Sequence, residues 1–294
     1  MKLDRSSLAP SRRAARAGIG LAAALSVSGG LTVIAEGCGG DTAAADTTSG
    51  ARVALHTRVD VDPASLGEFT TGFGWKVKLT KAAASLGALY YFDGAPAFVR
   101  RDAPRAPAQG ALARLFGVGV AHAHPGHYLA GDALGEMLTP TSVDLFGGAQ
   151  PLADAAGVTG DYRSARFVFG DHPVGPAASA LGGHVAVAEG TATKADGSTK
   201  TPIHFTVSAD FADVAKSVVD GEVSGCDFTE AHVEGDGTVT LTLRPAIWFE
   251  LVDFAKVAPG SAAAPTVIPH GDVAQIGFAL GLVQLTAYRF AFAK

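Results

Sequence analysis

One short segment in the first half of the chain holds the residue types best suited to chemistry. It reads His-Ala-His-Pro-Gly-His-Tyr and contains three of the nine histidines, His122, His124 and His127. The following proline biases His124 toward an extended backbone, in which His122 and His124 point to the same face. The Pro-Gly pair suits the centre of a type II turn, which brings the Cα atoms of His124 and His127 within about 7 Å. The spacing therefore predicts that three imidazoles share one metal ion.

The side chains around this segment narrow the choice of metal. Imidazole ligands suit zinc and copper, and raw affinity favours copper(II). Met137 is the only methionine after the first residue and no cysteine lies nearby, which disfavours a cuprous or blue-copper site. We therefore expect copper(II) or zinc. Tyr128, Asp132 and Glu136 are further candidate ligands, because a helix over 132–138 would place Asp132 and Glu136 one turn apart; alternatively, Asp132 caps that helix and Glu136 faces solvent.

The remaining motifs favour binding over catalysis. The chain has no G-x-S-x-G elbow, no phosphate-binding P-loop and no dinucleotide-binding glycine fingerprint after a strand. A three-histidine centre is catalytic only when it leaves a coordination position open, so a metallohydrolase or oxidase ranks third. The second hypothesis is an envelope domain without metal, in which aromatic residues around Trp248 hold a carbohydrate or a protein. Core packing is the expected role of Trp248 itself.

The N-terminal region has the layout of a targeting segment. Five basic residues precede an apolar stretch from 17 to 35, which ends in Ala-Glu-Gly before Cys38. These residues resemble the lipobox of bacterial lipoproteins, although Glu36 stands where a small or apolar residue is usual. The resemblance implies that residues 1–37 are a signal segment, that Cys38 is lipidated, and that the protein is attached to a membrane. Gly39 after the cysteine favours the outer membrane; the alternatives are an uncleaved anchor or a periplasmic or secreted protein.

Composition divides the rest of the chain into a tether and a folded part. Residues 38–50 are mostly Gly, Ala, Thr and Ser and predict a flexible tether, whereas residues 51–294 predict a single β-rich domain. From Cys38 onward the chain keeps 18 of its 23 basic and 26 of its 28 acidic residues, a net charge of −8 that argues against nucleic acid as a partner. Cys226 has no second cysteine within the domain and is expected to be buried and inert.

Alternating apolar and polar residues predict the fold class. We expect a mainly β protein, an antiparallel β-sandwich or irregular barrel with a few short helices. Turn residues predict two hairpins, one joining 183–193 to 202–208 and one joining 228–233 to 238–243. Further strands are expected at 53–61, 74–80, 89–92, 142–146, 162–169 and 287–292, and helices at 132–138, 210–219 and 272–282.

The first hairpin carries two histidines, for which the sequence predicts no joint site. A symmetric turn would place His204 opposite Glu189 and point His184 to the other face. A cross-strand pair of His204 with Glu189 is the simplest interpretation. The other histidines, at 56, 172, 232 and 270, are expected to be structural or surface residues.

Overall fold

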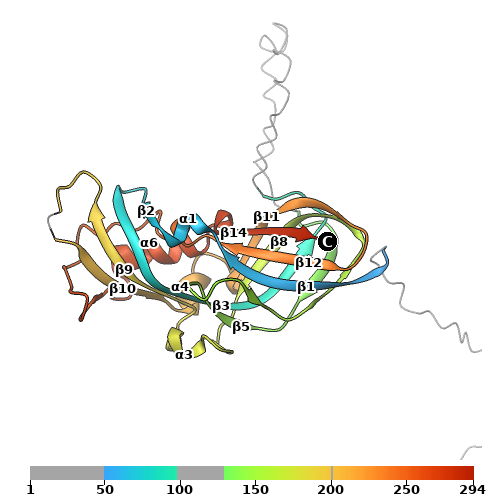
Figure 1. Ribbon diagram of the computed structural model, residues 1–294, viewed down its shortest axis with the longest axis horizontal. Coiled ribbons are helices and arrows are strands. Elements are labelled where there is room, and N and C mark those ends of the chain that lie inside the picture. Colours follow the sequence, from blue (N-terminus) through green and yellow to red (C-terminus); the bar gives the residue numbers. More distant parts are fainter. Residues whose placement is uncertain (1–49, 98–128, 200) are drawn as a thin grey trace, which may run out of the picture. The chain divides into compact units, whose positions relative to one another are not determined.

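The computed structural model describes residues 50–97, 129–199 and 201–294 (Figure 1). By its contacts the chain divides into residues 1–45 and residues 46–294, and all described residues belong to the second unit. These residues form a 14-stranded sheet with a few short helices, so the mainly β fold class is confirmed. No helix among the described residues is long and apolar enough to cross a membrane.

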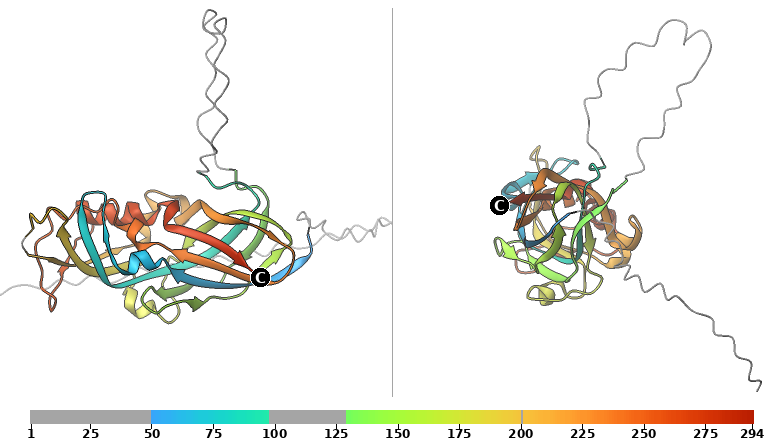
Figure 2. Two further views of the ribbon diagram at one scale, coloured as in Figure 1. Left: turned by 45° about the horizontal axis from the view of Figure 1, so that its top comes forward. Right: turned by 90° about the vertical axis from the view of Figure 1, so that its right-hand side faces the viewer.

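Eight strands of the sheet close into an irregular barrel. The order around it is β3-β4-β7-β1-β12-β14-β11-β8, and β8 pairs with β3 to complete the ring. Figure 2 (right) shows these strands surrounding a common interior. Most neighbours are antiparallel, but β1 pairs with β12 and β11 pairs with β14 in parallel. The strands are β1 (Arg52–Val61), β3 (Trp75–Phe92), β4 (Ala133–Met137), β7 (Ala155–Val158), β8 (Gly160–Phe169), β11 (Glu222–Val233), β12 (Gly237–Leu243) and β14 (Tyr288–Ala293).

Aromatic side chains fill the barrel. Tyr91, Tyr162, Phe228 and Phe290 are buried, and their ring centroids lie 5.5 to 6.2 Å apart. Burial raises the pKa of the Tyr162 hydroxyl to about 12, and the hydroxyl lies 2.8 Å from the carbonyl oxygen of Val158. Along these strands, successive side chains point alternately into the barrel and toward solvent. This alternation produces the apolar–polar pattern that predicts the strands from the sequence.

A second layer extends the sheet beyond the barrel. The first half of β3 pairs with β9 (Ala186–Lys194), which pairs with β10 (Ile203–Ala209), and β10 pairs with the short β13 (Thr266–Val267). Helix α6 (Val273–Leu282) packs against β10 (Figure 1), and α5 (Pro245–Trp248) contacts α6. The smaller elements are α1 (Pro63–Leu66), β2 (Glu68–Thr70), β5 (Thr141–Asp144), β6 (Gln150–Pro151), α3 (Ala178–Leu181), α4 (Phe211–Ala215), η1 (Val219–Gly221) and η2 (Leu285–Ala287).

Helix α6 begins and packs where its sequence indicates. The side chain of Asp272 accepts a hydrogen bond from the backbone N of Ala274 at 2.9 Å and caps the helix. Gly277 and Gly281 face the backbone carbonyls of Leu251 and Trp248, where a Cβ atom would clash. These glycines therefore set how closely α6 approaches the segment around α5, and the predicted helix at 272–282 is confirmed apart from its capping residue.

Trp248 lies in the core of this layer. Its side chain is fully buried, as are those of Phe249, Phe254 and Phe278. The hypothesis of an exposed aromatic surface around Trp248 for a carbohydrate is therefore wrong, and the expected core role is confirmed. Cys226 is also buried, as expected, and burial raises its pKa to about 12, which disfavours the reactive thiolate.

Two local predictions are wrong. Residues 132–138 do not form a helix: β4 runs through them, because the chain pairs backbone to backbone with the end of β3, with Glu136 opposite Tyr90. Strands β11 and β12 do not form a hairpin, because β14 pairs with both of them. The turn before β12 contacts β1 instead. There the side chain of Asp236 accepts a hydrogen bond from the backbone N of Ala54 at 2.7 Å.

We expect Phe290→Ala to lower the free energy of unfolding by about 3 to 5 kcal/mol, because it leaves a cavity among the barrel rings. Urea unfolding followed by circular dichroism measures the loss. Ile276→Ala is the matched control: this side chain is exposed on α6, so its loss should change stability by no more than about 0.5 kcal/mol. Equal effects of the two substitutions would contradict a barrel filled by aromatic packing.

Candidate functional site: a two-histidine, one-carboxylate cluster

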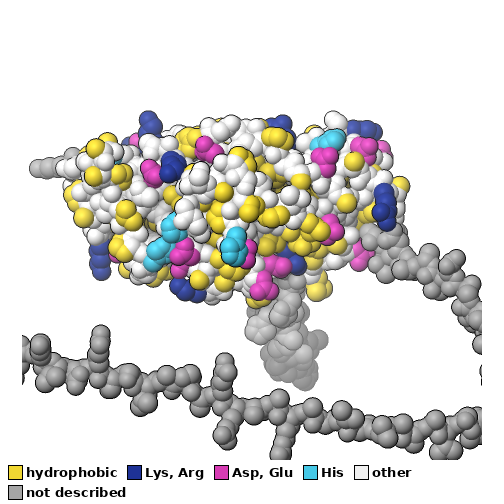
Figure 3. Space-filling view, turned by 90° about the horizontal axis from the view of Figure 1, so that it is seen from below, with side chains coloured by type: hydrophobic (Ala, Val, Ile, Leu, Met, Phe, Trp, Pro, Cys, Tyr) yellow, Lys and Arg dark blue, Asp and Glu magenta, His cyan; other side chains and the backbone are white. Residues whose placement is uncertain are grey.

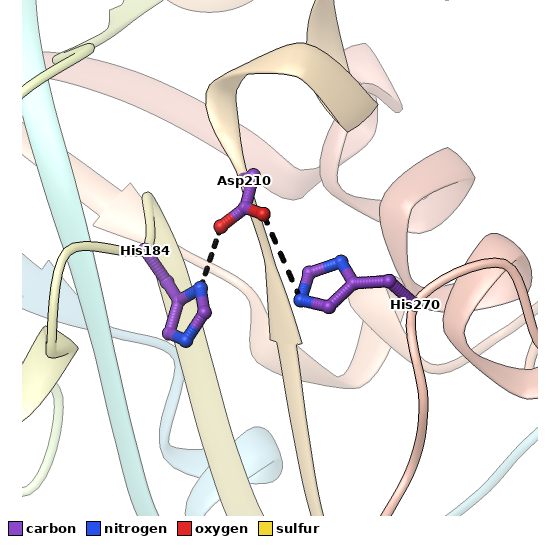
Figure 4. Close-up of side chains that lie close together, drawn as sticks. All are labelled: His184, Asp210 and His270. Carbon is purple, nitrogen blue, oxygen red and sulfur yellow. Dashed lines mark hydrogen bonds and ion pairs between the residues drawn. The ribbon is translucent and has the colours of Figure 1, made fainter. Parts of the chain in front are cut away.

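Three segments far apart in the sequence bring His184, Asp210 and His270 together; we call them the two-histidine cluster (Figure 4). His184 precedes β9 and Asp210 follows β10, and these strands are antiparallel, so the start of one lies beside the end of the other. The backbone N of Val185 donates to the carbonyl of Ala209 at 2.9 Å. His270 follows β13. Because β13 pairs with β10 in parallel, the chain after β13 lies near the same end of the sheet as Asp210.

The ligand atoms of the cluster lie within 4.8 Å of one another. His184 Nδ1 is 2.6 Å from Asp210 Oδ1, and His270 Nε2 is 3.7 Å from Asp210 Oδ2. The planes of the two imidazole rings are inclined by 29°, and the ring centroids lie 5.6 Å apart. The Asp210 carboxylate therefore lies between the two histidines and contacts one with each oxygen.

A second carboxylate supports the cluster from inside. Asp213, in α4, has a side chain only 11% exposed, and its Oδ2 lies 3.0 Å from His270 Nδ1. The same oxygen accepts hydrogen bonds from the Gln275 side chain at 3.0 Å and from the backbone N of Asp210 at 3.1 Å. Burial raises the pKa of Asp213, but the Asp210 N–H, Lys216 and His270 outweigh it, and the pKa lies below its usual value. These contacts favour the ionised form of Asp213, whose carboxylate oxygens accept hydrogen bonds.

The cluster faces solvent. The side chains of His184, Asp210 and His270 are 33%, 47% and 41% exposed. Figure 3 shows a face of the molecule on which histidine side chains lie directly beside acidic ones. Two imidazoles and one carboxylate are donors that zinc, copper(II) and other borderline divalent metals accept, and three protein ligands leave further positions for water.

The residues predicted from the sequence are not part of this cluster. His122, His124, His127, Tyr128 and the lipidation candidate Cys38 lie outside the described residues. The three-histidine site and the lipid anchor therefore stay predictions.

Asp132 lies beside the end of β3. Its backbone N donates to Asp93 Oδ1 at 2.7 Å, and the backbone N of Gly94 donates to the carbonyl of Ala130 at 2.9 Å. Residues 94 and 130 are therefore adjacent. Asp132 also lines a pocket of about 220 Å³ with Asp93, Asp161 and Arg163, and remains a candidate ligand.

Glu136 lies on a different surface from Asp132. It is exposed on β4 and lines a groove of about 750 Å³ with Ala54 of β1, Ala156 of β7 and Asp154, the residue before β7. Four residues of extended chain separate the Cα atoms of Asp132 and Glu136 by about 13 Å. The prediction that a helical turn brings these two carboxylates together is therefore wrong.

Sequence reasoning missed the two-histidine cluster although the first hairpin carried a signal for it. The observed register pairs His204 with Thr191 and Thr206 with Glu189, so the predicted pairing of His204 with Glu189 is wrong by two residues. Either register brings residue 184 next to residue 210, because the predicted pairing places it opposite residue 209 and the observed pairing, continued by two residues, opposite residue 211. His184 and Asp210 were thus predictable neighbours, whereas nothing in the sequence indicates that the chain before α6 returns His270 to them.

Comparison of the chain with protein-family models, with curated proteins and with solved structures finds no match. Its function is therefore argued from the geometry alone.

Exposed histidine–carboxylate pairs elsewhere on the surface give a pH-dependent signal. Asp161 accepts a hydrogen bond from the ring of His232 and raises its pKa, as Asp154 does for His56. A raised folded-state pKa means that each pair stabilises the fold fully below the pKa of an unfolded histidine, and that this contribution is lost as pH rises through the folded-state pKa.

We expect Asp161→Asn to lower the pKa of His232 toward 6.5, the value of an unperturbed histidine. A proton NMR titration of the histidine ring signals measures it. His56 is the control within the same sample, because its partner is Asp154 and its pKa should remain raised. An unchanged His232 titration in the variant would show that the ion pair does not form in solution.

Proposed function

We propose that the protein binds a divalent transition metal, zinc or copper(II), at His184, Asp210 and His270. The observation that carries the proposal is the convergence of two imidazoles and one carboxylate, from three segments, with their ligand atoms within 4.8 Å. In a tetrahedral site with bonds of about 2.1 Å, ligand atoms lie about 3.4 Å apart. The 3.7 Å between His270 Nε2 and Asp210 Oδ2 is close to this spacing.

A metal ion at this place would replace a proton. The 2.6 Å contact of His184 Nδ1 with Asp210 Oδ1 requires a hydrogen between the two atoms. Binding through that nitrogen displaces the hydrogen, which a neutral imidazole carries at Nε2 instead, and moves the two atoms apart by less than 1 Å, a change that half-exposed side chains tolerate.

The wider proposal is an envelope protein that stores, delivers or senses this metal. It rests on the lipobox-like residues before Cys38, on a tether over 38–50, and on the predicted site at His122, His124 and His127. The acidic charge of the mature chain is compatible with collecting cations. Metal-dependent hydrolysis or oxidation is not favoured by any described residue.

We expect the double variant His184→Ala/His270→Ala to lose one equivalent of zinc or copper(II) relative to the unaltered protein, because it removes both imidazoles of the cluster. Isothermal titration with elemental analysis counts the metal. His172→Ala is the matched control: this histidine also contacts an aspartate, Asp171, at 3.0 Å, but stands outside the cluster. A third variant with alanine at 122, 124 and 127 tests the predicted three-histidine site separately. Each site is expected to bind one equivalent of metal, so each variant should lose only the equivalent of the site that it removes. Unchanged stoichiometry in the double variant would overturn the proposal.

We also expect the metal to stabilise the fold, because its ligands join the β9–β10 hairpin to the chain before α6. Free metal at 100 times its dissociation constant should raise the free energy of unfolding by about 2.7 kcal/mol. Thermal unfolding with zinc and with a chelator measures the difference. Asp210→Asn should abolish it, and a stabilisation that survives in this variant would place the metal elsewhere.

A further inference from the structure

The geometry around Asp213 assigns it a role beyond folding. Its Oδ2 is the meeting point of three donors: His270 Nδ1, Gln275 Nε2 and the backbone N of Asp210. Its Oδ1 accepts from Lys216 Nζ at 3.0 Å. Asp213 therefore contacts one cluster histidine and the backbone of the cluster carboxylate while it does not itself face the space between them.

The contact with Asp213 decides which nitrogen of His270 carries the proton. A carboxylate oxygen only accepts hydrogen bonds, so Nδ1 of His270 must be the donor in their 3.0 Å contact. In a neutral imidazole the lone pair then belongs to Nε2. Nε2 lies 3.4 Å from the Ser208 hydroxyl, which can donate to it, and faces Asp210 Oδ2.

Asp213 is itself fixed by its other partners. Gln275 donates to Asp213 and also to the backbone carbonyl of Ser208 at 3.3 Å, while its amide oxygen accepts from the backbone N of Gly271. One buried glutamine therefore joins α6, the end of β10 and the residue after His270. The imidazole of His270 has one well-defined orientation because both the carboxylate and the backbone around it are tied down.

We propose that Asp213 is a positioning residue that holds His270 in the Nδ1–H tautomer and presents its Nε2 lone pair to the metal. The inference rests on the proposed function. It extends that proposal by naming the ligand atom, His270 Nε2, and the group that selects this atom, the Asp213 carboxylate. Carboxylates that orient metal-binding histidines in this way typically contribute 10- to 100-fold to metal affinity.

The first test needs no metal. Long-range proton–nitrogen NMR of the metal-free protein at mildly alkaline pH reports which ring nitrogen of His270 is protonated. We expect Nδ1–H in the unaltered protein and in Asp213→Asn, whose amide oxygen still accepts the bond, and a mixture of tautomers in Asp213→Ala. Asp171→Ala, which removes the carboxylate beside His172, is the control and should leave His270 unchanged. An Nε2–H tautomer in the unaltered protein, or no change in Asp213→Ala, overturns the inference.

The second test titrates zinc into the same variants. We expect zinc affinity to fall 10- to 100-fold in Asp213→Ala, and less in Asp213→Asn, because the asparagine keeps the acceptor. Equal zinc affinity in all three proteins overturns the inference while the proposed function stands. If the unaltered protein binds neither zinc nor, in a parallel titration, copper(II), the proposed function is overturned and, with it, the metal-presenting part of the inference, whatever the tautomer. If Asp213→Ala does not fold, Asp213→Asn decides alone: a retained Nδ1–H tautomer with a smaller loss of zinc affinity supports the inference, and zinc affinity equal to that of the unaltered protein overturns it.

Discussion

Strand β3 is the element on which the rest of the structure depends. Along one edge it pairs first with β9 and then with β8; along the other it pairs in turn with β2, β5 and β4. One strand of 18 residues therefore belongs both to the barrel and to the extended layer. Its register shifts between Leu79 and Lys81 and again between Leu86 and Leu89, and such irregularities bend a strand and increase its twist. The small residues between these points allow the chain to pass from one layer to the other without a break in pairing.

The two-histidine cluster lies next to this bend. Ala84 of β3 pairs with Ala186 of β9, and Ala186 pairs with Ala209 of β10, the residue before Asp210. The backbone N of Ser85 donates to the carbonyl of Val185, the residue after His184. His184 and Asp210 are thus attached to backbone that β3 holds in register, at the point where the sheet passes from the β9–β10 extension into the barrel. Precise placement of His184 and Asp210 follows from strand pairing, and only His270 depends on a loop and on the contacts of Asp213 and Gln275.

The sequence was informative where one residue in two faces the core. Alternation predicted β1, β8 and β12 within a residue or two, and the Asp-Gly turn predicted the β9–β10 hairpin. It failed where pairing depends on segments far away in the chain. Strand β14 separates β11 from β12, and no local signal indicates that the last strand enters between them. At 132–138 a helical spacing of Asp132 and Glu136 competed with pairing to β3, and the long-range hydrogen bonds prevailed.

The same distinction explains the outcome for the site. Histidines close together in sequence attract attention because a single turn can bring them to one ion, whereas residues 184, 210 and 270 meet only through tertiary structure. Three half-exposed candidate ligands from three segments are also more typical of reversible binding than of a closed structural site, because solvent would reach a bound ion and complete its coordination. The groove of about 750 Å³ lies on β1, β4 and β7, on strands that do not carry the cluster. With Asp213 as its proposed positioning residue, the proposed site would be accessible to water and separate from the groove, and would therefore suit uptake and release of a metal ion better than chemistry on a bound organic substrate.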